Sequence, residues 1–288
     1  MINHKTIAFI GPGVMAEAMI YGLIQHQVAG ADEIVAAGPR RERLDQLQAE
    51  YHIATVPDNR EAVGNSDVVV LSVKPQRLDR VLGGLSGAIQ PQALVISIVA
   101  GAPIEKITRG LEHDLVVRCM PNTPAQIGEG ITVWTASQGV RPEQLDLARR
   151  ILGALGKEVF VEEESYLDMA TALSGTGPAY VFLFMEALVD AGVHLGFPRR
   201  IAEELVIQTV RGSVDFYEKR EDPKHLARLR NEVTSPGGTS AAALYYLEKA
   251  GFRTAISRAI WAAYERSQEL GRGGRSHVPE RPLDSSSA

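Results

Sequence analysis

Residues 6–16 read TIAFIGPGVMA, and this stretch predicts the fold of the first half of the chain. An apolar run of strand type ends at Ile10, a GxGxxA pattern follows directly, and residues 17–25 have a helical pattern. This is the dinucleotide-binding fingerprint, whose glycines permit a tight turn and close approach of a pyrophosphate, and whose alanine permits close packing of helix on strand. The alternative is a glycine turn that binds no ligand.

The segment after the second strand bears on which dinucleotide binds. A strand-type run at residues 33–37 is followed by Gly38, Pro39, Arg40 and Arg41. Sites for NAD usually place an Asp or Glu there, on the ribose 2′-hydroxyl. Two arginines without a carboxylate favour pairing with a 2′-phosphate, so the sequence predicts NADPH, with NADH possible. Alternatively, one or both arginines only solvate the start of the next helix.

Strand-type and helix-type segments alternate up to residue 161, which is typical of a doubly wound, mostly parallel sheet. Further apolar, β-branched runs occupy residues 67–73, 93–99, 115–120, 131–135 and 157–161. We therefore predict an α/β fold, with a Rossmann-type dinucleotide-binding domain over residues 1–161.

The strand signal disappears after residue 162. Helical patterns cover residues 166–195, 199–220, 223–232, 239–249 and 252–271. We predict an all-helical dimerisation and substrate domain over residues 162–271. The tail, residues 272–288, is rich in Gly, Arg, Pro and Ser, and we expect it to be disordered.

The helical half is unusually apolar. Residues 170–173, 179–183 and 187–189 leave little polar face, and a helix that is apolar all round should be buried. A domain of about 110 residues has limited room to bury it alone. We predict a two-fold homodimer of interleaved helical domains, with an intrachain core helix as the alternative. The charge-free stretch 169–185 is short for a membrane span and is interrupted by Gly and Pro, so no membrane association is expected.

The composition is typical of a soluble enzyme. The chain has 288 residues, of which 45% are hydrophobic, and a net charge of −5, which argues against a nucleic-acid partner. The single cysteine, Cys119, excludes an intrachain disulfide and a cysteine-based metal site, so no metal is expected. A reducing compartment and the absence of a signal-peptide pattern in residues 1–10 favour a cytoplasmic location.

Three loops follow later strands, where open α/β sheets bind their ligands. Together with a polar loop at Asn59, they contain Ser72, Val73, Lys74, Ala100 and Asn122. Taken singly, Lys74 could be an exposed strand-end lysine and Asn122 could be part of a turn. Taken together, these residues predict a cofactor cleft, with Asn59 near the adenosine ribose.

A second motif lies in residues 230–247, RNEVTSPGGTSAAALYYL. Ser235 is a favoured N-cap type, and Pro236 suits the first position of a helix. The two glycines at 237–238 would each cost about 1 kcal/mol relative to alanine inside a helix, which indicates that a ligand approaches the backbone. Free amides at a helix N-terminus suit a carboxylate or phosphate, although an ordinary capped helix start is the alternative. The flanking hydroxyl groups belong to Ser235, Thr239 and Ser240.

Five segments now form a recognisable series: FIGPGVMA, SVKPQ, CMPNTPA, SGTGPAY and VTSPGGTSAAAL. In order and spacing they resemble pyrroline-5-carboxylate reductase, over about residues 5 to 270. The resemblance implies reduction of 1-pyrroline-5-carboxylate to L-proline with NADPH or NADH, the last step of proline biosynthesis. It also implies a Rossmann domain joined to a helical dimerisation domain, in a family whose members often assemble into decamers.

The resemblance and the loops together give the predicted site residues. Those for the cofactor are Gly11, Gly13, Val14, Met15, Arg40, Arg41, Asn59, Ser72, Val73, Lys74, Ala100 and Asn122. Those for the substrate are Ser235, Gly237, Gly238, Thr239 and Ser240, with Thr239 and Ser240 also catalytic. Two positions depart from the family pattern. Pro12 stands where Gly or Ser is common, and Ser240 stands where Thr is usual, which keeps the hydroxyl but loses a methyl that limits its rotamers.

The expected chemistry explains why no acid and base pair is evident. Hydride transfer to an imine carbon needs an aligned, dry site and a protonated or hydrogen-bonded imine nitrogen. We expect the proton to come from solvent, with the Ser240 hydroxyl orienting the nitrogen, and neither His113 nor His194 is favoured as an acid.

Two rival functions share the fingerprint. A β-hydroxyacid dehydrogenase would normally use a lysine on the interdomain helix, and residues 165–195 contain none. A non-catalytic NADP(H)-binding sensor would not need the second motif.

Overall fold

The structure is a computed structural model and describes residues 5–220 and 225–271. By compactness, the described residues form two units. The first contains residues 5–175 and 263–271, and the second contains the described residues from 176 to 262. The predicted domain boundary at residues 161 and 162 stays a prediction. The predicted disordered tail, 272–288, lies outside the described residues.

The first unit is built on one eight-stranded sheet, with strand order β3-β2-β1-β4-β5-β6-β7-β8. All neighbouring strands pair in parallel except β6 and β7, which are antiparallel. The strands are β1 (Ile7–Ile10), β2 (Ile34–Ala37), β3 (Ala54–Val56), β4 (Val68–Leu71), β5 (Leu94–Ser97), β6 (Val116–Met120), β7 (Gly130–Ala136) and β8 (Gly156–Phe160). The predicted Rossmann-type, mostly parallel sheet is confirmed.

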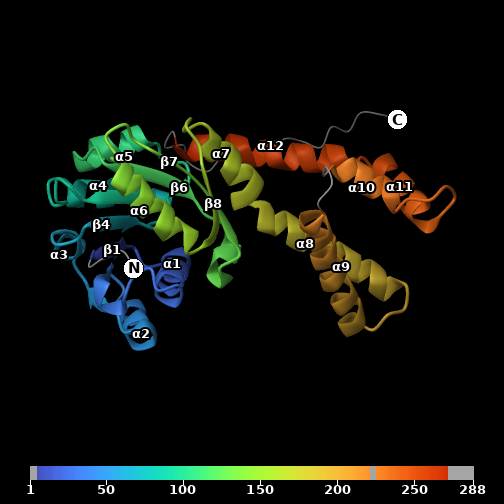
Figure 1. Cartoon of the computed structure of the whole chain (residues 1–288), viewed down its shortest axis with the longest axis horizontal. Helices are drawn as coiled ribbons and strands as arrows, with labels where there is room; N and C mark the ends of the chain where they lie inside the picture. Colours follow the sequence, from blue (N-terminus) through green and yellow to red (C-terminus); the bar gives the residue numbers. More distant parts are fainter. Residues whose placement is uncertain (1–4, 221–224, 272–288) are drawn as a thin grey trace. The chain divides into compact units, whose positions relative to one another are not determined.

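Helices cover both faces of this sheet (Figure 1). The helical elements between residues 5 and 175 are α1 (Val14–Gln25), η1 (Ala31–Glu33), α2 (Arg41–Tyr51), α3 (Asn59–Val63), α4 (Pro75–Leu85), α5 (Ile104–Leu111), η2 (Thr123–Ile127), α6 (Pro142–Gly153), α7 (Tyr166–Ala170) and the π-helical turn η3 (Thr171–Gly175). Successive strand residues point to opposite faces, so Ile7 and Phe9 pack with α1, α2 and α6, while Ala8 and Ile10 pack with α3, α4 and α5. Burial on both faces explains why the strands are continuously apolar.

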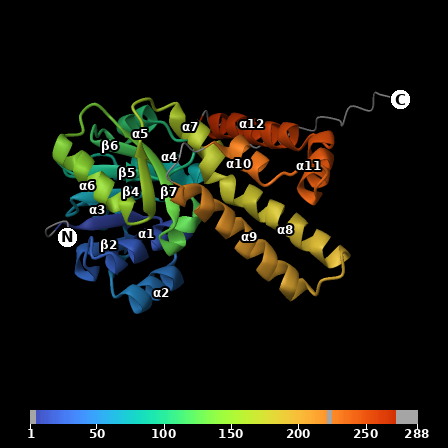
Figure 2. The ribbon, with the colours of Figure 1, turned by 45° about the vertical axis from the view of Figure 1, so that its right-hand side comes forward.

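The second unit is helical. Its helices are α8 (Gly177–His194), α9 (Arg199–Lys219), α10 (Leu226–Glu232), α11 (Thr239–Lys249) and the first part of α12 (Phe252–Gly271). Helices α8 and α9 run side by side (Figure 2). Gly192 permits their close approach, because a Cβ there would lie 3.1 Å from the Cβ of Ala202. The predicted helices at 199–220, 239–249 and 252–271 are confirmed. The continuous helix predicted at 166–195 is wrong, because α7, the π-helical turn η3 and α8 divide this stretch. Helix α10 begins at Leu226, and the predicted residues 223–224 lie outside the described part of the chain.

The apolar side chains of the second unit are largely exposed. Among its described residues, only Val189 and Ala202 are buried. Phe182 and Leu183 on α8 are 63% and 67% exposed. The second unit alone therefore does not bury these helices, which argues against an intrachain core helix within it.

One stretch, Tyr166–His194, is long and apolar enough to cross a membrane by length and composition alone. This criterion is weak for a single helix, and the π-helical turn η3 interrupts the stretch. The expected absence of membrane association stays a prediction.

Candidate functional site

The fingerprint forms a tight turn between β1 and α1. Gly11 has a φ of +85°, a conformation that L side chains rarely adopt. A Cβ at Gly11 would also lie 2.4 Å from Cγ1 of Val73, so both conformation and space require glycine. Gly13 is the N-cap of α1, so no side chain caps the first amides of this helix. Val14, the next residue, is 61% exposed. The N-terminus of α1 is thus open, with bare backbone suited to a pyrophosphate.

Ser72 fixes this turn from the neighbouring strand. Its hydroxyl donates to the carbonyl oxygens of Ile10 and Gly11, each at 3.0 Å. Its backbone amide also donates to the Ile10 carbonyl oxygen, at 3.0 Å. The structure therefore brings Ser72 and Val73 together with Gly11, at the point where strand order reverses between β1 and β4. Lys74 follows as the exposed N-cap of α4.

Pro12 is accommodated by contacts that sequence reasoning missed. Its ring lies against Gly38, where a Cβ would be 2.9 Å from Cδ of Pro12. Arg43 on α2 donates through Nε to the Pro12 carbonyl at 3.0 Å and pairs with Glu17 at 2.5 Å. The fingerprint turn is thereby joined to the loop after β2.

The predicted adenosine-side residues lie after β2 and β3. Arg40 is the N-cap of α2 and Arg41 its first residue. Both are exposed, and neither forms an ion pair with a described residue. The prediction that Asn59 lies in a loop is wrong, because Asn59 is the first residue of α3, after the N-cap Asp58. Its buried Oδ1 has no hydrogen-bond partner among the described residues. An unpaired buried acceptor is costly, so a donor such as a ribose hydroxyl would suit this position.

The loop after β5, residues 98–103, is called the Ala100 loop below. Gly101 in this loop has a φ of +70°. A Cβ at Gly101 would lie 2.9 Å from both the Ser267 carbonyl oxygen and the Gly271 amide nitrogen. The end of α12 therefore packs directly on the backbone of the Ala100 loop.

Asn122 lies after β6 and is buried. Its Oδ1 accepts a hydrogen bond from the Ile131 amide at 2.9 Å, which connects the start of η2 to β7. The side-chain oxygen thus has a structural partner, and a contact of Asn122 with the cofactor stays a prediction.

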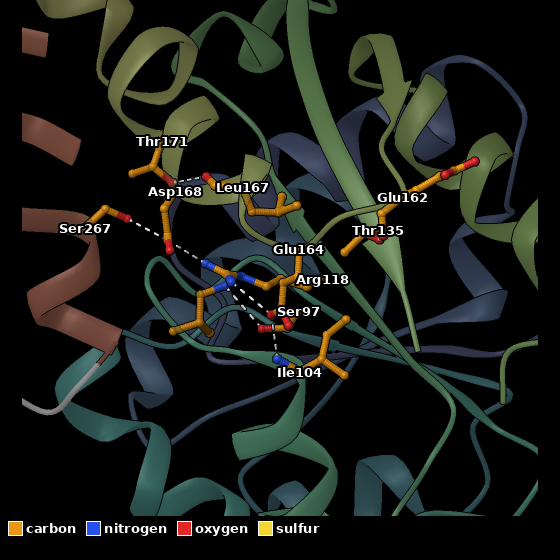
Figure 3. A network of polar contacts seen from close by, with 11 residues as sticks. Ser97, Ile104, Arg118, Thr135, Glu162, Glu164, Leu167, Asp168, Thr171 and Ser267 are labelled. Carbon is orange, nitrogen blue, oxygen red and sulfur yellow. Dashed lines mark hydrogen bonds and ion pairs between the residues drawn. The ribbon is translucent and has the colours of Figure 1, made fainter. Parts of the chain in front are cut away.

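An ionic cluster, which sequence reasoning missed, centres on the buried Arg118 of β6 (Figure 3). Its Nη1 donates to Glu164 Oε1 and its Nη2 to Asp168 Oδ1, each at 2.9 Å. Glu164 Oε1 also accepts the Ile104 amide at 2.7 Å, and Asp168 Oδ1 accepts the Ser267 hydroxyl at 3.0 Å. The only sequence signal was a charged residue inside an apolar strand. These residues are called the Arg118 cluster below.

The second motif lies in the second unit and corrects one prediction. Gly237 has a φ of +73°, which is incompatible with a helix, and the Gly238 amide donates to the Ser235 carbonyl at 3.0 Å. Residues 235–238 thus form a turn, Gly238 is the N-cap, and α11 begins at Thr239. The prediction that Ser235 caps the helix and Pro236 opens it is wrong.

The turn still leaves the N-terminus of α11 free of a side-chain cap. A Cβ at Gly238 would lie 2.4 Å from Ser235 Oγ, so glycine keeps this hydroxyl close to the turn. The first amides of a helix lack intrahelical acceptors, and Thr239 and Ser240 supply the first two here. All predicted substrate residues therefore lie around one helix start, whereas all predicted cofactor residues lie in the first unit.

Neither histidine that was considered as an acid gains support. His113 is buried, and its Nε2 lies 2.7 Å from the Ala93 carbonyl oxygen, which is a structural contact. His194 is the last residue of α8. Among the described residues, no group of three or more His, Cys, Asp or Glu side chains could hold a metal ion.

Comparison with known proteins identifies two matching sequence families. Residues 164–270 match the family "Pyrroline-5-carboxylate reductase dimerisation". Residues 6–101 match the family "NADP oxidoreductase coenzyme F420-dependent".

Similar proteins match over nearly their full lengths. A pyrroline-5-carboxylate reductase of Synechocystis is 46% identical, over 92% of this chain and 98% of the relative. One of Pseudomonas aeruginosa is 41% identical, over 93% of this chain and 98% of the relative. The solved pyrroline carboxylate reductase of Plasmodium falciparum, with NADP bound, has a TM-score of 0.85 at 32% identity, covering 94% of this chain and 99% of that chain. The solved enzyme of Coxiella burnetii also has a TM-score of 0.85, at 36% identity, covering 95% of this chain and 100% of that chain.

Proposed function

Because the chain belongs to the pyrroline-5-carboxylate reductase family, we propose which of its residues bind the cofactor and which bind the substrate. The enzyme reduces the cyclic imine 1-pyrroline-5-carboxylate to L-proline with NADPH or NADH, the last step of proline biosynthesis. The observation that carries this conclusion is 46% identity across 98% of the length of a curated relative.

The residues of the first unit fit NADPH. The open backbone at Gly11 and Gly13 receives the pyrophosphate at the N-terminus of α1. The exposed guanidinium groups of Arg40 and Arg41 pair with the 2′-phosphate, and Asn59 Oδ1 accepts a hydroxyl hydrogen bond. Bound NADPH supplies the hydride for the imine carbon.

The remaining predicted cofactor residues shape the rest of the cofactor site. Ser72 and Val73 hold the fingerprint turn in its left-handed conformation. Met15 lies in the first turn of α1 and packs partly against the core, so its backbone stays beside the fingerprint turn. Lys74, Ala100 and Asn122 follow β4, β5 and β6, and they border the nicotinamide side of the site.

The substrate is held at the start of α11. Backbone amides at Gly238, Thr239 and Ser240 receive the substrate carboxylate, which the positive end of the helix favours. The Ser240 hydroxyl donates a hydrogen bond to the imine nitrogen and orients it, while the proton comes from solvent. Thr239 and Ser235 supply the neighbouring hydroxyl groups.

The helical region serves assembly as well as substrate binding. A dimerisation family covers residues 164–270, which supports oligomerisation. We propose residues 162–271 as the dimerisation and substrate domain of a homodimer, with a decamer of such dimers as the larger assembly. The exposed apolar residues on α8 supply the surface that a second copy covers. A cytoplasmic location is supported by the single, buried cysteine.

The reaction is tested by following NADPH and NADH absorbance with the purified protein. The substrates are 1-pyrroline-5-carboxylate, the cyclic imine one carbon larger, and a 3-hydroxy acid. We expect rapid oxidation with the five-membered imine, and faster turnover with NADPH than with NADH. Turnover of the 3-hydroxy acid alone would instead favour a dehydrogenase, and NADPH binding without any turnover would favour a sensor.

The role of Ser240 is tested by the pair Ser240→Ala and Ser240→Thr. Loss of the orienting hydroxyl should lower kcat about tenfold or more, with an unchanged Kd for NADPH. The threonine variant keeps the hydroxyl and should retain activity. Equal kcat values for Ser240→Ala and the unmodified enzyme would refute this role.

A further inference from the structure

The Arg118 cluster is not used by any step proposed above. Arg118 is 4% exposed on β6, an interior strand of the sheet, and its guanidinium faces two carboxylates, Glu164 and Asp168. Buried ion pairs contribute little net stability compared with well-packed apolar residues of similar size, because desolvation offsets their attraction. Stability alone therefore gives a weak reason for this arrangement.

Glu164 connects the cluster to one end of the Ala100 loop. Its Oε1 accepts both Arg118 and the amide of Ile104, the first residue of α5. The N-cap of α5 is Pro103, which makes no side-chain cap, so this amide has no acceptor within the helix. Glu164 thus supplies the missing acceptor from a distant segment and fixes the point where the loop enters α5.

Asp168 connects the cluster to the opposite side of the same loop. Its Oδ1 accepts the hydroxyl of Ser267, which is 2% exposed on the last part of α12. The backbone of Ser267 and Gly271 lies against Gly101, where the space is too small for a Cβ. The last turn of α12, around Ser267 and Gly271, therefore limits where the Gly101 backbone can lie.

Arg118 is the residue that joins these two supports. Its two nitrogens hold Glu164 and Asp168 in a fixed arrangement, as the planar, forked guanidinium allows (Figure 3). The Ala100 loop lies between the start of α5 and the end of α12, and one guanidinium contacts both carboxylates that support it.

We propose that Arg118 is a positioning residue for hydride transfer, which holds the Ala100 loop at the nicotinamide side through Glu164, Asp168 and Ser267. The proposal rests on the assignment of Ala100 to the cofactor site. A loop that moves by about 1 Å misaligns the reacting carbons and slows the chemical step, while contacts at the pyrophosphate and adenosine maintain the affinity for NADPH.

Each variant changes one side chain of the Arg118 cluster and leaves the other side chains in place. Glu164→Gln keeps an oxygen for the Ile104 amide but removes the charge that faces Arg118. Ser267→Ala removes one hydroxyl, and Arg118→Lys keeps the charge but loses the fork. The matched control is Glu105→Gln on the first turn of α5, because the Glu105 carboxylate pairs with Arg109 and both side chains are more than three-quarters exposed.

Three experiments are made on each variant. They measure the Kd for NADPH by fluorescence, the kcat with its primary deuterium isotope effect from deuterated NADPH, and hydrogen exchange of residues 98–106 in the free enzyme. We expect kcat to fall about threefold to tenfold with a larger isotope effect, and the Kd to change less than about twofold. Exchange at Ile104 should become about tenfold faster as the loop opens more often. The control should match the unmodified enzyme in all three.

Two results would overturn the proposal. One is unchanged exchange in residues 98–106 together with an unchanged isotope effect. The other is a loss of kcat that follows only the loss of folded protein. Hydrogen exchange needs neither substrate nor turnover, so it reports on the loop even if the unmodified enzyme fails to reduce the imine, a result that would instead refute the proposed function.

Discussion

Arg40 and Arg41 are the residues on which cofactor preference should depend. Both are exposed at the start of α2, after the strand that usually carries the carboxylate of an NAD site. Replacing both with Gln should raise the KM for NADPH about tenfold to hundredfold, because a charge-assisted pair with the 2′-phosphate contributes about 1.5–3 kcal/mol. The KM for NADH should change little. Steady-state kinetics with each cofactor measures this, and an equal change for both would contradict it.

Cys119 should be unreactive in the folded enzyme. It is 2% exposed, and burial raises the pKa of its thiol well above the usual range, although the nearby Arg118 charge lowers it. The thiolate is the reactive form, so alkylation at pH 8 to 9 should be slow in the native protein and should proceed to one group per chain in denaturant. Mass spectrometry after iodoacetamide treatment measures this, and rapid native labelling would show that β6 opens.

At the scale of residues, local constraints were predictable and long-range partners were not. Gly11 was predictable because a fingerprint turn needs a residue that tolerates positive φ. Arg118 is different, because its partners lie 46 and 50 residues away along the chain. The sequence shows a positive charge in an apolar strand, but it does not show which carboxylates pair with it.

The turn that opens α11 depends on a left-handed residue. Gly237→Ala should destabilise this turn by about 1–2 kcal/mol, because alanine is strained at the φ of +73° even though the space around it is open. The start of α11 would shift, so the KM for the imine should rise more than the KM for NADPH. Kinetics with each substrate varied in turn tests this.

A second glycine provides the matched comparison. Gly83 lies inside α4, and a Cβ added to it would meet no other atom within 4 Å, so Gly83→Ala should stabilise that helix by about 0.5–1 kcal/mol. The midpoint of thermal unfolding should therefore fall for Gly237→Ala and rise for Gly83→Ala. Only Gly237→Ala should change the KM values. A loss of stability at Gly83 would contradict the open surroundings described for it.

Helices and strands were predictable where the apolar pattern extended over many residues or where the strand was fully buried. Helix α11 and helix α12 begin and end where the pattern predicts. Strand β3 was missed because it spans only Ala54–Val56 at the sheet edge, where Ala54 is exposed and no apolar run is required. The helix cap at Ser235 was predicted wrongly because residue type alone does not reveal the left-handed Gly237 that delays the helix.

At the scale of the whole molecule, the exposed apolar surface of α8 should be covered by a second copy. Introducing a charge at Phe182 or Leu183 should dissociate the dimer, because burying such a side chain contributes about 1.5–3 kcal/mol and symmetry places each change twice in the interface. Light scattering should then give one chain mass, 31.2 kDa, in place of a multiple of it.

Ile127→Glu is the matched control for this change. Ile127 is 75% exposed, but it belongs to the first unit and lies outside the dimerisation match at residues 164–270. Its charged variant should keep the mass of the unmodified assembly. Dissociation by both variants would contradict the assignment of the interface to α8.

The end of α12 also has a consequence for the order in which the chain folds during synthesis. The first unit is discontinuous, since residues 263–271 belong to the same unit as residues 5–175. Asp168 and Ser267, which bond to each other, are separated by 99 residues. At about 5–20 residues per second, a ribosome adds Ser267 roughly 5 to 20 s after Asp168. The hydrogen bond between Asp168 and Ser267 can form only after that interval, so we expect the Ala100 loop to reach its native position late in folding.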